Sequence, residues 1–227
     1  MDFCKSVSAY KTRVLGLLPA EIYGILFLNK KPRPRWVRME DAMEITPRMS
    51  DHALLARTAA AGSMVLLKNT GSTLPLLPLE DGTPMPVAVF GAGQIRTCLC
   101  SADIHPWKKG NILDALCQSR RIVPDGLLAH RYRNAALKDP LDGELDAAAL
   151  DLSRLREENA AAIVVIARSD RDTRTLTEHE LALLRRVCAV FERTVLVLNT
   201  PLGIDLGEAV QCPAIVYAGL GGQEMGA

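Results

Sequence analysis

The sequence predicts an α/β fold, a three-layer sandwich in which helices cover both faces of a mainly parallel sheet. Three short apolar runs, at residues 163–167, 195–198 and 215–217, occupy the second half of the chain, with a helical pattern between the first two. Strands that are buried on both faces read as continuous runs of Val, Ile and Leu. We therefore expect parallel strands joined by right-handed βαβ crossovers, with residues 87–90 as a further strand.

The composition allows one sizeable core and argues against several classes of partner. The 227 residues are 48% hydrophobic, and 27 Lys and Arg stand against 26 Asp and Glu. This balance leaves no basic stripe, so nucleic acid is not an expected partner. A small neutral molecule or another protein is favoured instead.

The cysteines indicate free thiols. Six of them, at positions 4, 98, 100, 117, 188 and 212, are too few for a disulfide scaffold of this length. Cys98, Cys100 and Cys117, taken with His105, match no common spacing of zinc ligands. Cys188 and Cys212 stand in apolar settings that are typical of buried thiols. We expect no metal and no other cofactor, and a reducing cytoplasm as the compartment.

Residues 1–44 read as a leader or linker, poorly ordered or packed on a partner. The apolar residues 14–28 include Pro19 and Glu21, and a basic, proline-rich run follows them. This stretch is too short to cross a bilayer, and no small-residue cleavage site follows it, so a cleaved signal or a membrane anchor is disfavoured. The domain itself is expected to span residues 45–227.

Helical patterns and turn signals divide that domain. Pro47 and Ser50 start a helix that places Leu54 and Leu55 on one side. Further helices are predicted at residues 111–117, about 147–159 and 177–190, the last with Thr177 as N-cap. Residues 124–140 show no clear period.

A glycine turn follows the strand at residues 87–90. Gly91 and Gly93 could begin a dinucleotide-binding fingerprint, but its third glycine position holds Arg96 and no helical pattern starts after Gly93. A nicotinamide or flavin site is therefore disfavoured.

Four motifs occur in a fixed order: VLLKN with LPL at residues 65–76, VAVFGAGQ at 87–94, LVLN at 196–199 and GGQE at 221–224. In this order and spacing the stretch 45–227 resembles the C-terminal α/β sandwich domain of glycoside hydrolase family 3, the β-glucosidase family. The resemblance implies hydrolysis of O-glycosyl bonds, a β-glucoside-like carbohydrate as ligand, and a (β/α)₈ barrel domain as partner, in cis or in trans. It also implies a domain that is truncated at its C-terminal end.

A retaining glycosidase needs two carboxyl groups, one as nucleophile and one as general acid and base. The resemblance places the nucleophile in the barrel domain and the acid/base Glu in the loop after residues 163–167. Here Arg171 falls near that position, and an arginine cannot donate a proton near neutral pH because its pKa is above ~12. Asp170 and Asp172 are substitute candidates for the acid, although surface charges that pair with Arg171 and Arg174 are the simpler interpretation. We expect the chain alone to be inactive.

Substrate contacts are expected from Asp103, Arg171 and Arg174, because residues 101–104 stand where the family carries a glycine-rich loop that lines the sugar pocket. More generally, ligands of open α/β sheets bind outside the carboxyl ends of the strands. Here those ends are followed by residues 169–172, 199–201 and 219–224. Two alternatives remain: a degenerate domain that binds carbohydrate or a partner without catalysis, and an unrelated nucleotide-binding domain, which the missing third glycine and the lack of a P-loop argue against.

Overall fold

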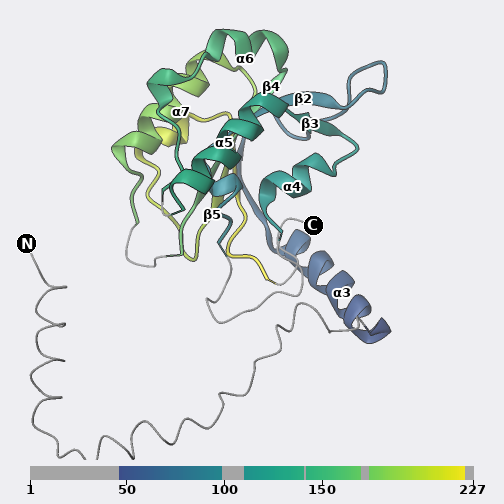
Figure 1. The fold of residues 1–227 in the computed structure, drawn as a ribbon. Coiled ribbons are helices and arrows are strands. Elements are labelled where there is room, and N and C mark those ends of the chain that lie inside the picture. Colours follow the sequence, from purple (N-terminus) through teal and green to yellow (C-terminus); the bar gives the residue numbers. More distant parts are fainter. Residues whose placement is uncertain (1–45, 99–109, 141, 170–173, 223–227) are drawn as a thin grey trace, which may run out of the picture. The chain divides into compact units, whose positions relative to one another are not determined.

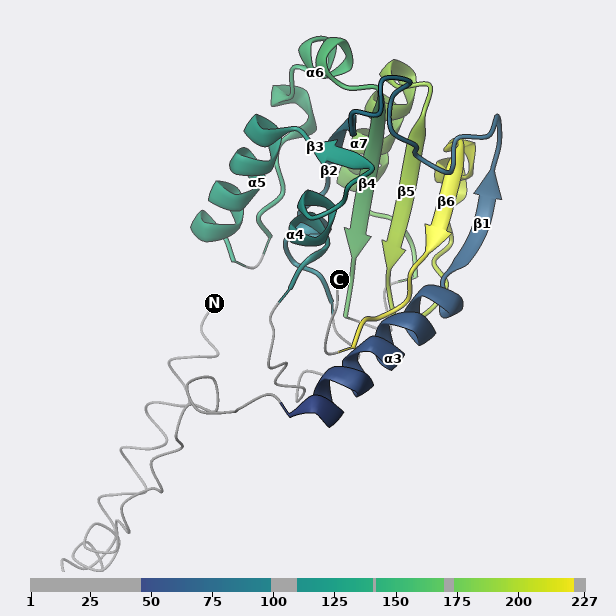
Figure 2. The same cartoon turned by 90° about the vertical axis from the view of Figure 1, so that its right-hand side faces the viewer.

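The computed structural model describes residues 46–98, 110–140, 142–169 and 174–222. Six strands form one sheet in the order β1-β6-β5-β4-β2-β3, parallel throughout except that β1 runs antiparallel to β6 (Figures 1 and 2). The strands are β1 (Val65–Asn69), β2 (Met85–Phe90), β3 (Ile122–Pro124), β4 (Ala161–Ala167), β5 (Thr194–Asn199) and β6 (Ala214–Tyr217). The predicted sheet is thereby confirmed.

Helices cover both faces of the sheet. The α-helices are α3 (Pro47–Ser63), α4 (Ile112–Cys117), α5 (Gly126–Lys138), α6 (Leu152–Glu158) and α7 (Glu178–Val190), with 3₁₀ turns η2 (Ala92–Gln94), η3 (Ala147–Ala149) and η4 (Gly207–Gln211). Side chains of α5, α6 and α7 pack on one face and those of α4 on the other, which gives the three layers seen in Figure 1, where the sheet is viewed nearly edge-on.

Strand β4 is apolar at every position because both of its faces are buried. Ala162, Val164 and Ile166 belong to the core beneath α5, α6 and α7, while Ile163 and Val165 belong to the core on the α4 side. Successive side chains of a strand point to opposite faces, so a central strand with both faces covered must be apolar at every position. All of these residues are at most 5% exposed.

Three elements differ from the prediction. The single helix expected at about 147–159 is instead the 3₁₀ turn η3 followed by α6. Asp146 caps the start of η3, and Asp151 caps the start of α6. The segment at residues 124–140, which shows no clear period, contains α5, and β3 ends at its first residue. The helix expected from Ser50 begins at Pro47, capped by Thr46, and none of its residues is buried.

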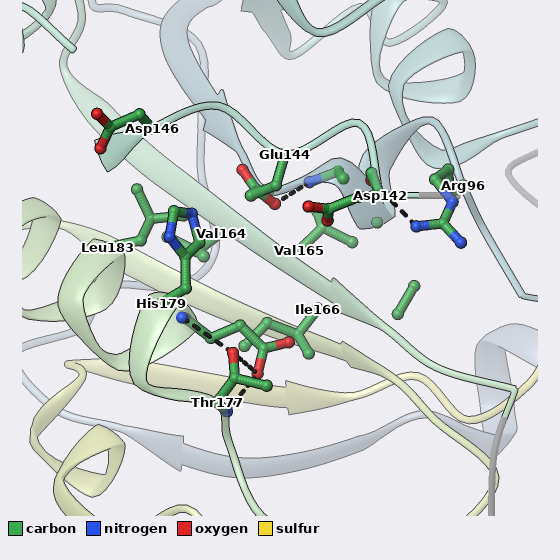
Figure 3. A pocket seen from close by; sticks show the side chains of 15 residues that line it. Arg96, Asp142, Glu144, Asp146, Val164, Val165, Ile166, Thr177, His179 and Leu183 are labelled. Atoms are coloured by element: carbon green, nitrogen blue, oxygen red, sulfur yellow. Dashed lines mark hydrogen bonds between the residues drawn. The ribbon is translucent and has the colours of Figure 1, made fainter. Parts of the chain in front are cut away.

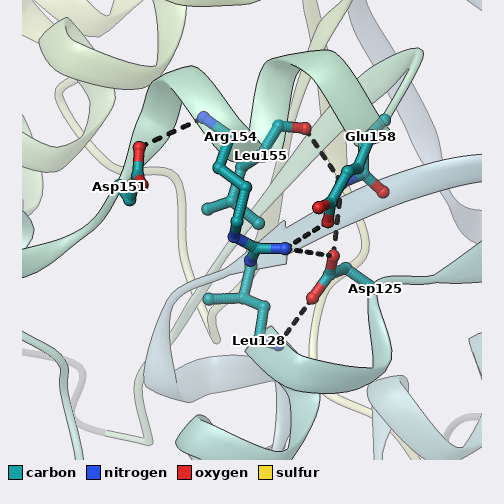
Figure 4. A network of polar contacts seen from close by, with 7 residues as sticks. Asp125, Leu128, Asp151, Arg154, Leu155 and Glu158 are labelled. Atoms are coloured by element: carbon teal, nitrogen blue, oxygen red, sulfur yellow. Dashed lines mark hydrogen bonds and ion pairs between the residues drawn. The ribbon is translucent and has the colours of Figure 1, made fainter.

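Asp125 joins the start of α5 to the end of α6 (Figure 4). Its Oδ1 accepts from the Leu128 amide at 2.6 Å as the N-cap of α5, and its Oδ2 lies 3.7 Å from Arg154 Nη1 and 3.4 Å from Asn159 Nδ2. The side chain of Asp125 is 8% exposed. A carboxylate this buried is stabilised by being paired and hydrogen-bonded, so the network fixes the two helices to one another.

No helix in the described ranges is both long enough and apolar enough to cross a membrane. The leader predicted at residues 1–44 lies outside those ranges.

Candidate functional site

The carboxyl ends of β2 and β4 form the switch point of the sheet. These strands are neighbours, yet the chain leaves β2 toward α4 on one face and leaves β4 toward α7 on the other. Such a divergence opens a crevice, which is the usual ligand position in open α/β sheets. A cavity of about 670 Å³ lies there, bordered by the turn after β2 and the end of β4.

Two walls enclose this cavity (Figure 3). One wall carries Arg96, just after η2, and carboxylates from the segment after α5. The other wall is the first turn of α7, and β4 supplies an apolar floor. The lining side chains include Arg96, Asp142, Glu144, Asp146, Val164, Ile166, Thr177, His179 and Glu180. Asp142 and His179 are exposed, so their side chains are available to a ligand, and Asp146 is also exposed although its Oδ1 caps η3.

The glycines after β2 are explained by packing on β4. A Cβ at Gly91, whose φ is +88°, would lie 2.2 Å from Val165 O, and one at Gly93 would lie 2.8 Å from Ala167 N. Only glycine allows this approach. Two amides of this turn are also occupied, since Gly91 N donates to Tyr132 Oη at 2.9 Å and Ala92 N donates to Glu144 Oε2 at 2.6 Å. Neither amide is therefore available to cradle a phosphate.

Glu144 and Tyr132 form the polar centre of this wall. Tyr132 Oη donates to Glu144 Oε1 at 2.9 Å, and the Leu145 amide donates to the same oxygen at 3.1 Å. Burial, and then the charge of Glu144, raise the pKa of Tyr132 well above its usual value. Tyr132 therefore stays protonated and serves as a fixed donor that holds the carboxylate in place.

The opposite wall is fixed by a capping box. Glu180 N donates to Thr177 Oγ1 at 3.2 Å, and Thr177 N donates to Glu180 Oε2 at 2.7 Å, as the sequence predicts. The same carboxylate pairs with the guanidinium of Arg168, the first residue after β4. Since both partners are largely buried, this pair holds the start of the loop after β4 against α7.

Asn199 links the loops at the carboxyl edge. Its Oδ1 accepts from Cys98 N at 2.6 Å, and its Nδ2 donates to Cys98 O at 3.1 Å and to Gly219 O at 2.6 Å. The end of β5 thus holds the loop after β2 and the loop after β6 together.

The sequence-predicted site residues are only partly visible. Asp103, Asp170, Arg171 and Asp172 lie outside the described residues. Arg174 is described: its side chain is exposed, and its carbonyl oxygen accepts from Asp205 N at 2.6 Å, beside the loop after β5. Arg174 does not line the cavity described here.

Sequence reasoning missed the two residues that organise the cavity wall. Tyr132 and Glu144 lie in or after the segment without a clear period, and their partners at Gly91 and Ala92 are distant in the chain. His179, in the first turn of α7, is exposed and also borders the cavity. The described residues hold no cluster of three or more side chains suited to a metal ion. The cavity offers hydrogen-bond acceptors and an imidazole to a polar ligand.

Comparison with known proteins connects this arrangement to one family. The model of the Glycosyl hydrolase family 3 C-terminal domain matches residues 64–227. A probable beta-glucosidase L from Aspergillus terreus is 27% identical over 203 residues, which is 78% of this chain and 26% of that protein.

Solved structures give the same result. The structure of beta-glucosidase 3B from Thermotoga neapolitana with α-D-glucose aligns with a TM-score of 0.66 at 25% identity, over 80% of this chain and 28% of that one. A beta-glucosidase from Paenibacillus barengoltzii aligns with a TM-score of 0.65 at 24% identity, over 75% and 22% of the two chains, which supports the fold. The chain spans about a quarter of the length of these relatives. It belongs to glycosyl hydrolase family 3, as a C-terminal α/β domain of that family.

Proposed function

We propose that this chain provides the α/β domain of a β-glucosidase-like enzyme that hydrolyses O-glycosyl bonds, and that it is not catalytic alone. The observation that carries the proposal is the family match over residues 64–227. The named relatives are a probable β-glucosidase and a β-glucosidase solved with glucose. A carbohydrate of the β-glucoside type is the proposed ligand, and a (β/α)₈ barrel domain, in cis or in trans, is the proposed partner.

The role of the domain follows from its carboxyl edge. Asn199 and the Arg168–Glu180 pair hold the bases of the loops after β2, β4 and β6, so these loops can be presented together to a barrel domain. Asp103, Arg171 and Arg174 are proposed to contact the sugar from this edge. Asp170 and Asp172 are proposed as surface charges rather than as the general acid, and Arg171 near the Glu position supports inactivity of the chain alone. The sparse cysteines support a reducing cytoplasm as the compartment.

The test is hydrolysis of an aryl β-glucoside by the purified chain, alone and after addition of a separately purified family barrel domain. We expect no turnover by the chain alone, because general acid–base catalysis is by itself worth ~10²–10⁴-fold and the nucleophile is proposed to reside in the barrel. Asp170→Asn and Asp172→Asn are compared with Asp81→Asn, which lies in the turn before β2. Activity in the mixture above that of the barrel alone supports the proposal.

Two outcomes contradict it. Turnover by the chain alone that is lost in Asp170→Asn or Asp172→Asn, but kept in Asp81→Asn, assigns a catalytic acid to this chain. Glucose binding by the chain alone, measured by calorimetry, with no rate gain in the mixture favours the degenerate carbohydrate-binding alternative.

A further inference from the structure

Two cysteines that are distant in sequence meet on the face of the sheet that α5, α6 and α7 cover. Cys188 is in the last turn of α7, and Cys212 stands between η4 and β6. Their sulfur atoms are 3.5 Å apart, and both are free thiols. A disulfide joins two sulfurs about 2.05 Å apart, so the two sulfur atoms have to approach one another by only about 1.5 Å.

Both cysteines are among the residues that line a second cavity. This cavity has a volume of about 370 Å³ and is lined by Leu184, Arg185, Cys188, Glu208, Gln211 and Cys212. Cys188 is half-buried, whereas Cys212 is 1% exposed. A small reagent that enters the cavity therefore meets Cys188 first and has Cys212 directly behind it.

The surroundings of the two thiols shift their pKa values in opposite directions. The hydrogen bond from the Cys212 thiol, and more weakly the charge of Lys68, lower the pKa of Cys188. The same hydrogen bond, which an ionised Cys212 could not donate, and then burial raise the pKa of Cys212. Lys68 is held nearby because its Nζ donates to Val210 O at 2.6 Å. The more accessible thiol is thus also the one that ionises more readily, which suits a nucleophile with a second thiol to resolve it.

We propose that Cys188 and Cys212 form a thiol–disulfide exchange site that reacts with a small-molecule disulfide such as oxidised glutathione. The Cys188 thiolate attacks one glutathione sulfur, the glutathione S–S bond breaks, and one glutathione leaves as a thiol with the proton of Cys188. The Cys212 sulfur then attacks the Cys188 sulfur of the mixed disulfide, and the second glutathione leaves with the proton of Cys212. Two protein thiols and one glutathione disulfide become one protein disulfide and two glutathione thiols.

The product links α7 covalently to the segment that enters β6. Pairing in this site is independent of the carboxyl edge, so its test does not depend on glycosidase activity.

The sequence provides a direct readout. Trypsin cleaves after Arg186 and Arg193, and no Lys or Arg follows Arg193, so Cys188 and Cys212 fall in the separate peptides 187–193 and 194–227, each with a single cysteine. The folded full chain is incubated with oxidised glutathione, alkylated, digested and analysed by mass spectrometry. We expect the two peptides to be joined by a disulfide, at least about tenfold more than any other cysteine pair.

Single variants separate the two steps. Cys212→Ser is expected to stop at the mixed disulfide, with glutathione on peptide 187–193, whereas Cys188→Ser is expected to leave Cys212 largely unmodified because it is buried. Cys117→Ser removes an exposed thiol on α4 and should leave the joined peptides unchanged. The same incubation in guanidinium should abolish the preference for the pair. Absence of the joined peptides in the folded chain while Cys117 is glutathionylated, or equal glutathionylation in Cys188→Ser and Cys212→Ser, overturns the proposal.

Discussion

The side chain of Asn199 and the backbone of Cys98 exchange two hydrogen bonds across 101 positions of sequence: Cys98 N donates to Asn199 Oδ1 at 2.6 Å, and Asn199 Nδ2 donates to Cys98 O at 3.1 Å. Asn199 is fully buried at the end of β5. One amide group therefore satisfies the backbone of the loop after β2 and, through Gly219 O, that of the loop after β6. Such a group is costly to remove because its partners are left unpaired.

Asn199→Ala is expected to lower the free energy of unfolding by about 3 kcal/mol, because it removes three hydrogen bonds and leaves a cavity. Asn199→Asp keeps the acceptor for Cys98 N but turns an oxygen toward two carbonyl oxygens, and is expected to be at least as harmful. Urea denaturation measures both. Asn134→Ala, at an exposed position of α5, is the control and should change stability by less than about 0.5 kcal/mol. Equal stability of the Asn199 and Asn134 variants would contradict the role of Asn199.

Tyr132 is expected to make the fold sensitive to alkaline pH. Its folded pKa lies well above the unfolded value of about 10, so the unfolded chain loses the phenolic proton first. The corresponding stability is fully present below about pH 10 and is lost as pH rises from there toward the folded pKa, by up to about 1.4 kcal/mol per pH unit.

The check is urea denaturation between pH 9 and pH 11, at about half-unit steps, for the wild type, Tyr132→Phe and Tyr217→Phe. We expect Tyr132→Phe to be less stable at neutral pH by about 1–3 kcal/mol, because Gly91 N and Glu144 lose a partner, yet to lose less stability on going alkaline. Tyr217→Phe, which loses only the bond to Thr200 O, should keep the wild-type slope. The same alkaline slope in all three proteins would count against the argument.

The strands of this domain can be predicted because a short run of consecutive residues is enough to show that they are buried. A strand such as β4 is covered on both faces, so its apolar run needs no knowledge of its partners. Helix α7 is predictable for a similar reason, since Thr177 and Glu180 stand three residues apart and form the capping box by themselves. Helix α5 was not predicted from the sequence. Only Leu128, Ala129 and Tyr132 of its residues are buried, and this apolar stripe is too narrow to show a helical period.

The cavity wall and the thiol pair are not predictable in this way. Ala92 N and Glu144 Oε2 are brought to 2.6 Å by the crossover from β3 to β4, and Cys188 meets Cys212 only once α7 has packed on the sheet. No pattern of spacing encodes either contact. The same limit applies to the loop of Asp170, Arg171 and Asp172, whose roles stay predictions.

Gly91→Ala is expected to destabilise the domain by more than about 3 kcal/mol. The new Cβ would meet Val165 O at 2.2 Å in a backbone conformation that side chains rarely adopt, and the obstructing atom belongs to the central strand β4, which cannot move aside. Gly203→Ala is the matched control, because its Cβ would meet no atom within 4 Å. The control should change the unfolding midpoint little. A Gly91 variant as stable as the control would show that the turn and β4 are less closely packed.

We expect the protein to self-associate through the exposed apolar side chains of α3 and β1, which are consecutive in the chain. Leu54 and Leu55 of α3 are 65% and 68% exposed, and Val65, Leu66 and Leu67 of β1 are 48–53% exposed on an edge strand. Exposed apolar side chains and the outer edge of an edge strand both favour association. We expect the sedimentation coefficient of the wild type to rise with concentration, and Leu54→Glu with Leu55→Lys to reduce that rise.

Leu137→Glu serves as the control for this experiment. Leu137 on α5 is 79% exposed, so it is at least as accessible as the α3 leucines, yet it belongs to a different element. If association depends on the α3 and β1 surface, Leu137→Glu should sediment like the wild type. A wild type that stays monomeric at all concentrations, or a Leu137 variant that suppresses association as strongly as the α3 double variant, would show that exposure of α3 and β1 does not determine assembly.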